Sequence, residues 1–163
     1  MDEGDDHCRY QWTAKGPLPD FDGKPDFLIH GPSLDSGAER ALGVVELKIK
    51  FGHSGHFPDE DISQAVRYGR SILENQPLRD HATVCLCTLE CVQFVRVFRN
   101  WPTIHTTKAE YMVGTRGHRS IAHPGMAQLH AYLTAPAAAH GVRDIQIDGY
   151  VDIYMYIYIY IYI

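Results

Sequence analysis

Apolar and polar residues alternate most regularly between residues 43 and 51, where the period is two. This period is typical of a strand that buries one face and exposes the other to solvent. The expected buried face holds Val45, Leu47, Ile49 and Phe51, and the opposite face holds Val44, Glu46, Lys48 and Lys50. The segment is therefore predicted to be a half-buried strand.

An apolar stripe with helical spacing follows, and it predicts a helix from about residue 62 to residue 74. Asp59 and Asp61 lie where carboxylates cap a helix and favour its positive end, and Pro77 lies where a helix stops. The stripe itself comprises Ile62, Ala65, Val66, Gly69, Ile72 and Leu73.

Three shorter apolar runs predict strands over residues 27–29, 82–88 and 92–99, with a tight turn near Leu89 and Glu90 between the last two. The order strand, strand, helix, strand, strand predicts an α/β (α+β) fold with a mixed central sheet and flanking helices. After residue 101 the periodicity fades, apart from a brief helix over residues 126–133.

The 163 residues suffice for one modest domain with appendages. We expect a polar N-terminal arm over residues 1–23, a core over 24–100, a weakly ordered extension over 101–149 and a low-complexity tail over 150–163. Tyr and Ile alternate in the tail, as they would in a translated TA-dinucleotide repeat. We interpret the tail as such a repeat or a gene-model error; the alternative is a β-aggregating or membrane-surface segment.

The formal net charge of −5 excludes a uniformly basic coat for binding nucleic acid, although a local basic face is compatible with it. Ordinary surface scatter explains the same basic residues equally well. The candidates for such a face are Arg67, Arg70, Arg79, Arg96, Arg99, Lys48 and Lys50.

The cysteines do not form a disulfide framework, because three of the four lie within seven positions. The N-terminus lacks the apolar core of a signal peptide, and no apolar stretch reaches the eighteen residues of a membrane span. We expect an intracellular protein of the cytoplasm or nucleus with no membrane partner. His81, Cys85, Cys87 and Cys91 suggest zinc only weakly, since a paired Cys-x-x-Cys is missing and small buried side chains explain them better.

The candidate chemistry lies on the first two core strands. Asp26 begins the first strand, and Glu46 and Lys48 lie two apart on one face of the next, so a hairpin would gather two carboxylates and an ammonium. Two carboxylates can hold Mg²⁺ or Mn²⁺, which activates water for phosphodiester chemistry, and Lys48 can stabilise charge on the phosphate. The alternative is that Glu46 and Lys48 belong to a solvated strand face.

Gln64 and Tyr68 lie four apart on the predicted helix and therefore share a face that can reach the same pocket. His53 and His56 flank a glycine loop nearby; a general-base role is the functional interpretation, and ordinary solvated loop histidines are the favoured one.

In this order, Pro25-Asp26, Glu46-Leu47-Lys48 and Gln64-Ala65-Val66-Arg67-Tyr68 resemble the PD-(D/E)XK, or restriction-endonuclease-like, nuclease superfamily, in the branch with a Q-x-x-x-Y helix. The resemblance implies a Mg²⁺- or Mn²⁺-dependent nuclease. It makes Asp26 and Glu46 metal ligands and Lys48 the catalytic lysine. It places Gln64, Tyr68 and Arg67 in the pocket or against nucleic acid. Family members usually place a helix with a further acidic residue before the first core strand. No such helix is predicted here, so either the chain is truncated or the metal site is incomplete.

A second resemblance covers residues 64–73, 76–79, 85–87 and 92–99. These segments are similar to the region ahead of the catalytic domain in fungal-type protein kinases and in Crinkler-like proteins. The chain contains none of the kinase phosphate-loop, His-Arg-Asp or Asp-Phe-Gly motifs. This resemblance implies a non-catalytic accessory domain that is fused to, or associates with, a kinase domain.

Overall fold

A computed structural model of the chain describes residues 10–12 (backbone only), 21–30, 41–49, 55–100, 102–112 and 123–142. The strands are β1 (Tyr10–Trp12), β2 (Phe27–His30), β3 (Ala41–Leu47), β4 (His81–Cys87), β5 (Cys91–Phe98), β6 (Ile104–Thr106) and β7 (Glu110–Tyr111). The helices are α1 (Asp59–Asn75), α2 (Pro124–Leu133) and the short 3-10 helix η1 (Ala137–His140).

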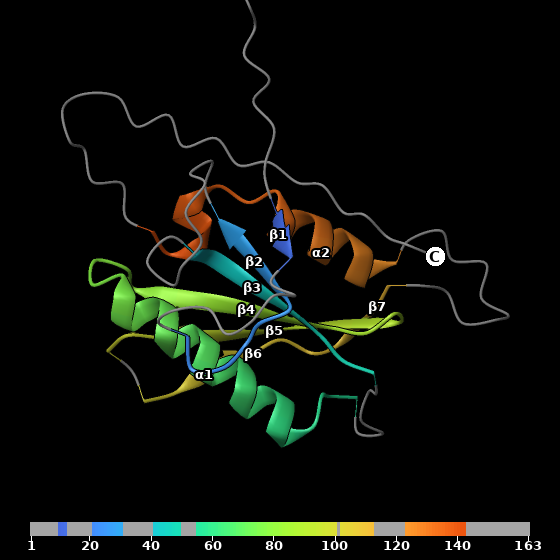
Figure 1. Cartoon of the computed structure of the whole chain (residues 1–163). Helices are drawn as coiled ribbons and strands as arrows, with labels where there is room; N and C mark the ends of the chain where they lie inside the picture. Colours follow the sequence, from blue (N-terminus) through green and yellow to red (C-terminus); the bar gives the residue numbers. More distant parts are fainter. Residues whose placement is uncertain are drawn as a thin grey trace, which may run out of the picture.

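The strands form one mixed sheet in the order β1-β2-β3-β4-β5-β6, and β7 pairs with β5 beside β6. Only β3 and β4 are parallel, and α1 provides the crossover between them. The helix α1 covers one face of the sheet, while α2 and η1 cover the other (Figure 1). The predicted mixed central sheet with flanking helices is confirmed.

The central elements follow the predicted pattern closely. The helix predicted over residues 62–74 spans Asp59–Asn75, and the hairpin predicted over 82–88 and 92–99 is β4 and β5. The brief helix after residue 125 is α2. The predicted capping of α1 is wrong: Pro58 is the N-cap residue, and Asp59 and Asp61 lie inside the first turn without a side-chain capping bond. Both carboxylates still lie near the positive end of the helix.

The prediction that β3 is half-buried is also wrong, because its residues 41–46 are buried on both faces. Val44 belongs to an apolar cluster beneath α1, whereas Val45 belongs to a second cluster beneath α2. The predicted alternation of faces is present, but each face meets a core. The strand ends at Leu47, and Ile49 is 98% exposed. Lys50 and Phe51 lie outside the described residues.

The sheet extends beyond the predicted core limits of 24 and 100. Strand β1, which the pattern did not predict, lies within the predicted arm, and Phe21 is buried with its ring centroid 6.2 Å from that of Tyr68. Strands β6 and β7 pair with β5 after residue 100. The predicted tail and most of the arm lie outside the described residues. In the part of the chain that is described, no helix combines the length and apolar character needed to cross a bilayer.

A buried arginine joins the elements at one end of the sheet. Arg79 is only 2% exposed, and its five N–H groups donate to five oxygens. The acceptors are the carbonyls of Ala41, Leu42, His81 and His140 and the side-chain oxygen of Gln76. Burial lowers the pKa of Arg79 to about 10, so the guanidinium stays charged at neutral pH. It thus connects β3, β4, η1 and the end of α1.

We predict that Arg79→Met lowers the free energy of unfolding by about 3–5 kcal/mol, because several buried carbonyls lose their only charged donor. Urea unfolding monitored by circular dichroism measures the change. Arg70→Met is the matched control, since Arg70 is exposed on α1, and it should change stability little. Equal stabilities of the two variants would contradict the claim that the Arg79 hydrogen bonds stabilise the fold.

A glycine in β3 allows α2 to reach the sheet. The Tyr132 hydroxyl donates to the carbonyls of Thr83 at 2.7 Å and Val44 at 3.2 Å, so α2 is pinned to β3 and β4. A Cβ atom at Gly43 would overlap that hydroxyl.

Gly43→Ala is accordingly expected to destabilise the protein by about 1–3 kcal/mol through overpacking. Thermal unfolding of the single variant, of Tyr132→Phe and of the double variant measures the coupling between the two sites. The penalty of the alanine should shrink in the Tyr132→Phe background, where the hydroxyl is absent. An unchanged penalty would show that the hydroxyl is not the group that limits this position.

Candidate functional site

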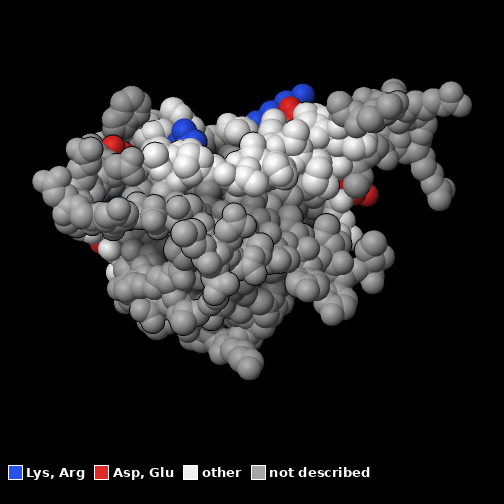
Figure 2. Space-filling model, turned by 90° about the horizontal axis from the view of Figure 1, so that it is seen from above, with Lys and Arg blue, Asp and Glu red and all other residues white. Residues whose placement is uncertain are grey.

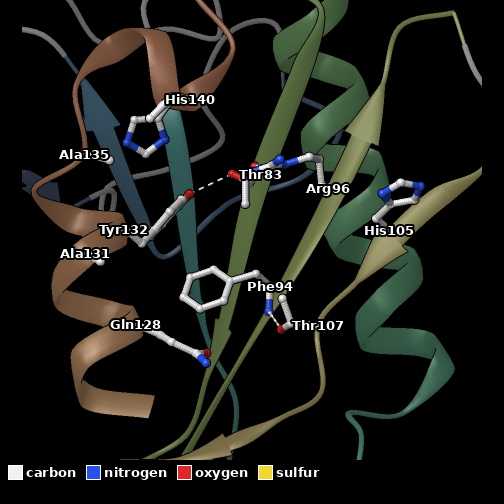
Figure 3. A pocket seen from close by; sticks show the side chains of 11 residues that line it. Thr83, Phe94, Arg96, His105, Thr107, Gln128, Ala131, Tyr132, Ala135 and His140 are labelled. Atoms are coloured by element: carbon white, nitrogen blue, oxygen red, sulfur yellow. Dashed lines mark hydrogen bonds between the residues drawn. The ribbon is translucent and has the colours of Figure 1, made fainter. Parts of the chain in front are cut away.

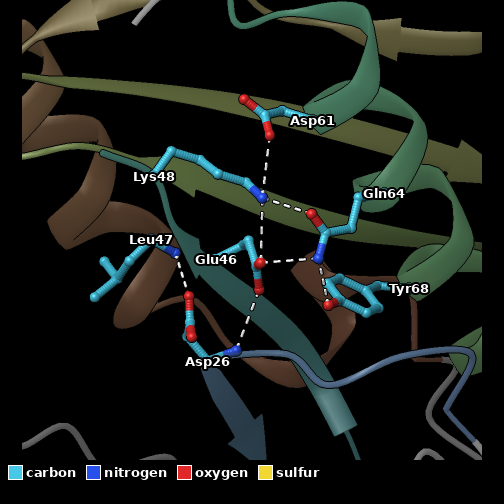
Figure 4. A network of polar contacts seen from close by, with 7 residues as sticks. All are labelled: Asp26, Glu46, Leu47, Lys48, Asp61, Gln64 and Tyr68. Atoms are coloured by element: carbon cyan, nitrogen blue, oxygen red, sulfur yellow. Dashed lines mark hydrogen bonds and ion pairs between the residues drawn. The ribbon is translucent and has the colours of Figure 1, made fainter. Parts of the chain in front are cut away.

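The predicted site residues come from three neighbouring elements at the end of the sheet opposite Arg79. Asp26 directly precedes β2, Glu46 lies near the end of β3, and Lys48 directly follows β3. The antiparallel register pairs Phe27 with Val45, and this pairing brings Asp26 beside Glu46. The first half of α1 lies over the same place and contributes Gln64 and Tyr68 (Figure 4).

Each of the two carboxylates is held by the backbone of the other strand. The Asp26 N–H donates to Glu46 Oε2 at 3.2 Å, and the Leu47 N–H donates to Asp26 Oδ2 at 2.8 Å (Figure 4). Glu46 is only 6% exposed. This reciprocal arrangement fixes both acids next to each other, as the hairpin argument predicts.

The Lys48 ammonium lies among three oxygen acceptors. It is 3.2 Å from Glu46 Oε1, 3.1 Å from Asp61 Oδ1 and 2.5 Å from Gln64 Oε1. Asp61 is a site residue that the sequence analysis missed, because it was assigned to helix capping. The available signal was its position three residues before Gln64, which places both on one helix face.

Gln64 links the acids to the helix. Its amide nitrogen donates to Glu46 Oε1 at 2.9 Å and contacts the Tyr68 hydroxyl at 2.7 Å, while its amide oxygen accepts from Lys48. Tyr68 is 1% exposed and lies under Phe21. Asp26, Glu46, Lys48, Asp61, Gln64 and Tyr68 together form what we call the acid–lysine network. The structure therefore brings together five of the six predicted site residues.

Burial and charge shift three pKa values in the acid–lysine network. Burial, and then the neighbouring Asp26 charge, raise the pKa of Glu46 above 4.5. Burial works to lower the pKa of Lys48, but its hydrogen bond to Asp61 and the charge of Glu46 outweigh burial and raise that pKa. Burial also raises the pKa of Tyr68, so its hydroxyl stays protonated at neutral pH. The network thus concentrates negative charge around one protonated lysine.

The sixth predicted residue, Arg67, lies apart from the acid–lysine network. Its side chain is 53% exposed, and its nearest acidic partner is Asp22, with 3.8 Å between nitrogen and oxygen. Gln64 and Tyr68 point to one side of α1, and Arg67 lies on another. An ion pair this exposed contributes little to stability.

Two of the predicted basic residues donate hydrogen bonds within the fold. Arg79 is buried, so its proposed contact with phosphate is wrong. Arg99 instead donates to the carbonyls of Leu73, Gln76 and Arg79, where it caps the end of α1. On the face seen in Figure 2, the described Lys and Arg side chains lie at separate points and not in a continuous stripe. Arg79 at least takes no part in a local basic face.

The cysteines behave as small buried side chains, as predicted. Cys85, Cys87 and Cys91 are buried, and burial raises the pKa of each thiol, that of Cys87 to about 11. Within the described ranges, no three His, Cys, Asp or Glu side chains are grouped to hold a metal ion. His56 lies beside Gln93, 3.2 Å from its amide nitrogen, and outside the acid–lysine network, while His53 is not among the described residues.

The donor set of the acid–lysine network fits a hard divalent cation. Two carboxylates on adjacent strands offer the oxygen ligands that Mg²⁺ and Mn²⁺ prefer. Glu46 is harder to ionise because it is buried next to another acid, and a divalent cation would relieve that repulsion. Asp26 and Glu46 are therefore the residues that would hold such an ion.

Comparisons with protein-family models, with curated proteins and with solved structures find no match to this chain.

We predict that Glu46 titrates above the ordinary glutamate value of 4.5, as followed by its carboxyl carbon signal in NMR. Asp26→Asn should lower this pKa because a negative neighbour is lost. Lys48→Met should raise it further because a cation is lost. Lys108→Met, which alters an exposed lysine between β6 and β7, should leave it unchanged. A Glu46 pKa at or below 4.5 in the unaltered protein would refute the burial argument.

Proposed function

We propose that this protein is a metal-dependent nuclease that hydrolyses phosphodiester bonds of nucleic acid. One observation carries the proposal: Asp26, Glu46 and Lys48 come from two strands and meet at a single point, where Gln64 of α1 joins Glu46 to Lys48. The order of these residues along the chain, which resembles the PD-(D/E)XK superfamily, supports the same assignment.

In this proposal Asp26 and Glu46 bind Mg²⁺ or Mn²⁺. Such a cation would supply Lewis acidity at a phosphoryl oxygen and would make a water molecule more acidic and so a better nucleophile. Glu46 has to be ionised to bind the cation, and its pKa is raised by burial and by Asp26. As the pH falls, cation binding and hydrolysis should therefore be lost at a higher pH than they would be with a glutamate of ordinary pKa.

Lys48 supplies positive charge beside the two carboxylates. Its ammonium lies 3.2 Å from Glu46 Oε1, so an N–H of Lys48 would be available to a phosphate oxygen if Glu46 held a cation instead. Asp61 and Gln64 keep the ammonium close while it turns. A preorganised donor of this kind stabilises the charge that develops on the phosphate.

Gln64 and Tyr68 act as positioning residues in this mechanism. Tyr68 is 1% exposed, so it shapes the site from below and does not stack on a base. Arg67 is exposed on the same helix, and its ion pair with Asp22 is long. It can therefore bind another phosphate group of the same nucleic-acid molecule.

A second function is favoured by a specific observation. Lys48 has three N–H donors, and three protein oxygens accept from them. A lysine whose three N–H groups all have acceptors in the protein can have a structural role as well as a catalytic one. The alternative is therefore a non-catalytic nuclease-like module, the accessory N-terminal domain of a fungal-type protein kinase.

Incubation of the full chain with supercoiled plasmid, or with single-stranded RNA, and Mg²⁺ or Mn²⁺ separates the two functions. We expect cleavage, and we expect Lys48→Ala to slow it by about 100-fold or more, the usual cost of losing one preorganised donor. Lys108→Ala is the matched control, because this lysine is exposed and outside the acid–lysine network, and it should cleave normally.

Calorimetry with Mg²⁺ and Mn²⁺ supplies an independent measurement, in which Asp26→Asn should abolish uptake. A folded protein that takes up neither ion and leaves both nucleic acids intact would overturn the nuclease and favour the accessory module. Equal cleavage by Lys48→Ala and the unaltered protein would overturn the role given to Lys48.

A further inference from the structure

A pocket lies on the other face of the sheet, away from the acid–lysine network. It has a volume of about 470 Å³ and is enclosed by β4, β5, the β6 region, α2 and η1 (Figure 3). Pockets of this size hold small organic molecules. Nothing in the proposed nuclease chemistry uses it.

One wall of the pocket is a row of rings. Phe94 and Tyr132 have centroids 5.1 Å apart, and Tyr132 and His140 have centroids 5.0 Å apart. The Tyr132 hydroxyl is already committed to backbone carbonyls, so the ring offers the pocket an apolar surface. A flat apolar group can lie against this wall.

Buried polar atoms without partners line the same pocket. His140 is 1% exposed, and the backbone of Tyr132 lies within reach of one ring nitrogen, while the other ring nitrogen has no partner among the described residues. The side-chain oxygen of Gln128 is likewise buried and without a partner in that part of the chain. Orphaned buried groups are rare because they are costly, and a bound molecule would satisfy them.

The charge of the pocket is positive. Arg96 uses Nε to donate to Thr83 at 3.2 Å, and its two terminal nitrogens make no further hydrogen bond among the described residues. No Asp or Glu is among the described residues that line the pocket. Burial, followed by the charge of Arg79, lowers the pKa of His140 to about 4, so at neutral pH the ring nitrogen that does not face the Tyr132 backbone is an acceptor.

We propose that this pocket binds a small organic anion with a flat apolar body. The body lies against Phe94 and Tyr132, the acidic group meets the Arg96 guanidinium, and a polar group at the other end meets His140 or Gln128. The acidic group is a carboxylate or a phosphate monoester, since a guanidinium pairs with either in the same forked geometry.

The test is a titration of the full chain with 4-hydroxybenzoate and with phenyl phosphate, followed by amide chemical shifts in NMR. Each probe has a flat ring and one acidic group, and the first also has a hydroxyl opposite its acid. We expect shifts centred on Phe94, Arg96 and Ala131 for at least one of them. The neutral 4-hydroxybenzyl alcohol should bind at least about 10-fold more weakly, because one charge-assisted pair is missing.

Two variants and a control make the test specific. Arg96→Gln should weaken binding by about 10-fold, whereas Arg70→Gln, an exposed arginine on α1, should not change it. Ala131→Phe, at an exposed α2 position lining the pocket, should abolish binding by filling the space without disturbing the core. The proposal is overturned if neither acid shifts these amides, if the alcohol binds equally well, or if Arg96→Gln binds as the unaltered protein does.

Discussion

The fold depends on the five hydrogen bonds that a single buried guanidinium donates. Arg79 connects the starts of β3 and β4 to the end of α1 and to η1, so it fixes both helical layers against the sheet. The alternative partners for those carbonyls would be water molecules, which a packed core excludes. Arg99 adds further hydrogen bonds at the same end of the sheet, since it donates to the Arg79 carbonyl and to carbonyls at the end of α1.

Arg79 holds the start of β3 in place, and the acid–lysine network lies at the other end of the same strand. β3 is buried on both faces, so its position is set by two apolar clusters and not by one. Glu46 belongs to this strand, so the packing of β3 also fixes the position of Glu46. The acids can therefore be held next to each other although their mutual repulsion opposes it, because the packing of the strand supplies the free energy.

Much of this architecture could be predicted from periodicity alone, and the exceptions have physical reasons. β3, α1, β4 and β5 are long enough to show a period, whereas β1, β6 and β7 have three residues or fewer. The double burial of β3 was missed because Glu46 looks like a solvent-facing residue. Arg79 was misplaced because arginine is seldom fully buried unless paired. The meeting of Asp26, Glu46 and Lys48 was predictable, because hairpin pairing fixes which strand ends adjoin.

Lys48 gives the cluster of acids a permanent counter-ion that is part of the chain itself. A centre built only from carboxylates would need an external cation to relieve its repulsion, and its folding would then be tied to metal supply. Here Lys48 offsets part of the negative charge of Asp26, Glu46 and Asp61 within the folded chain. Chelation of divalent ions should therefore leave the fold intact.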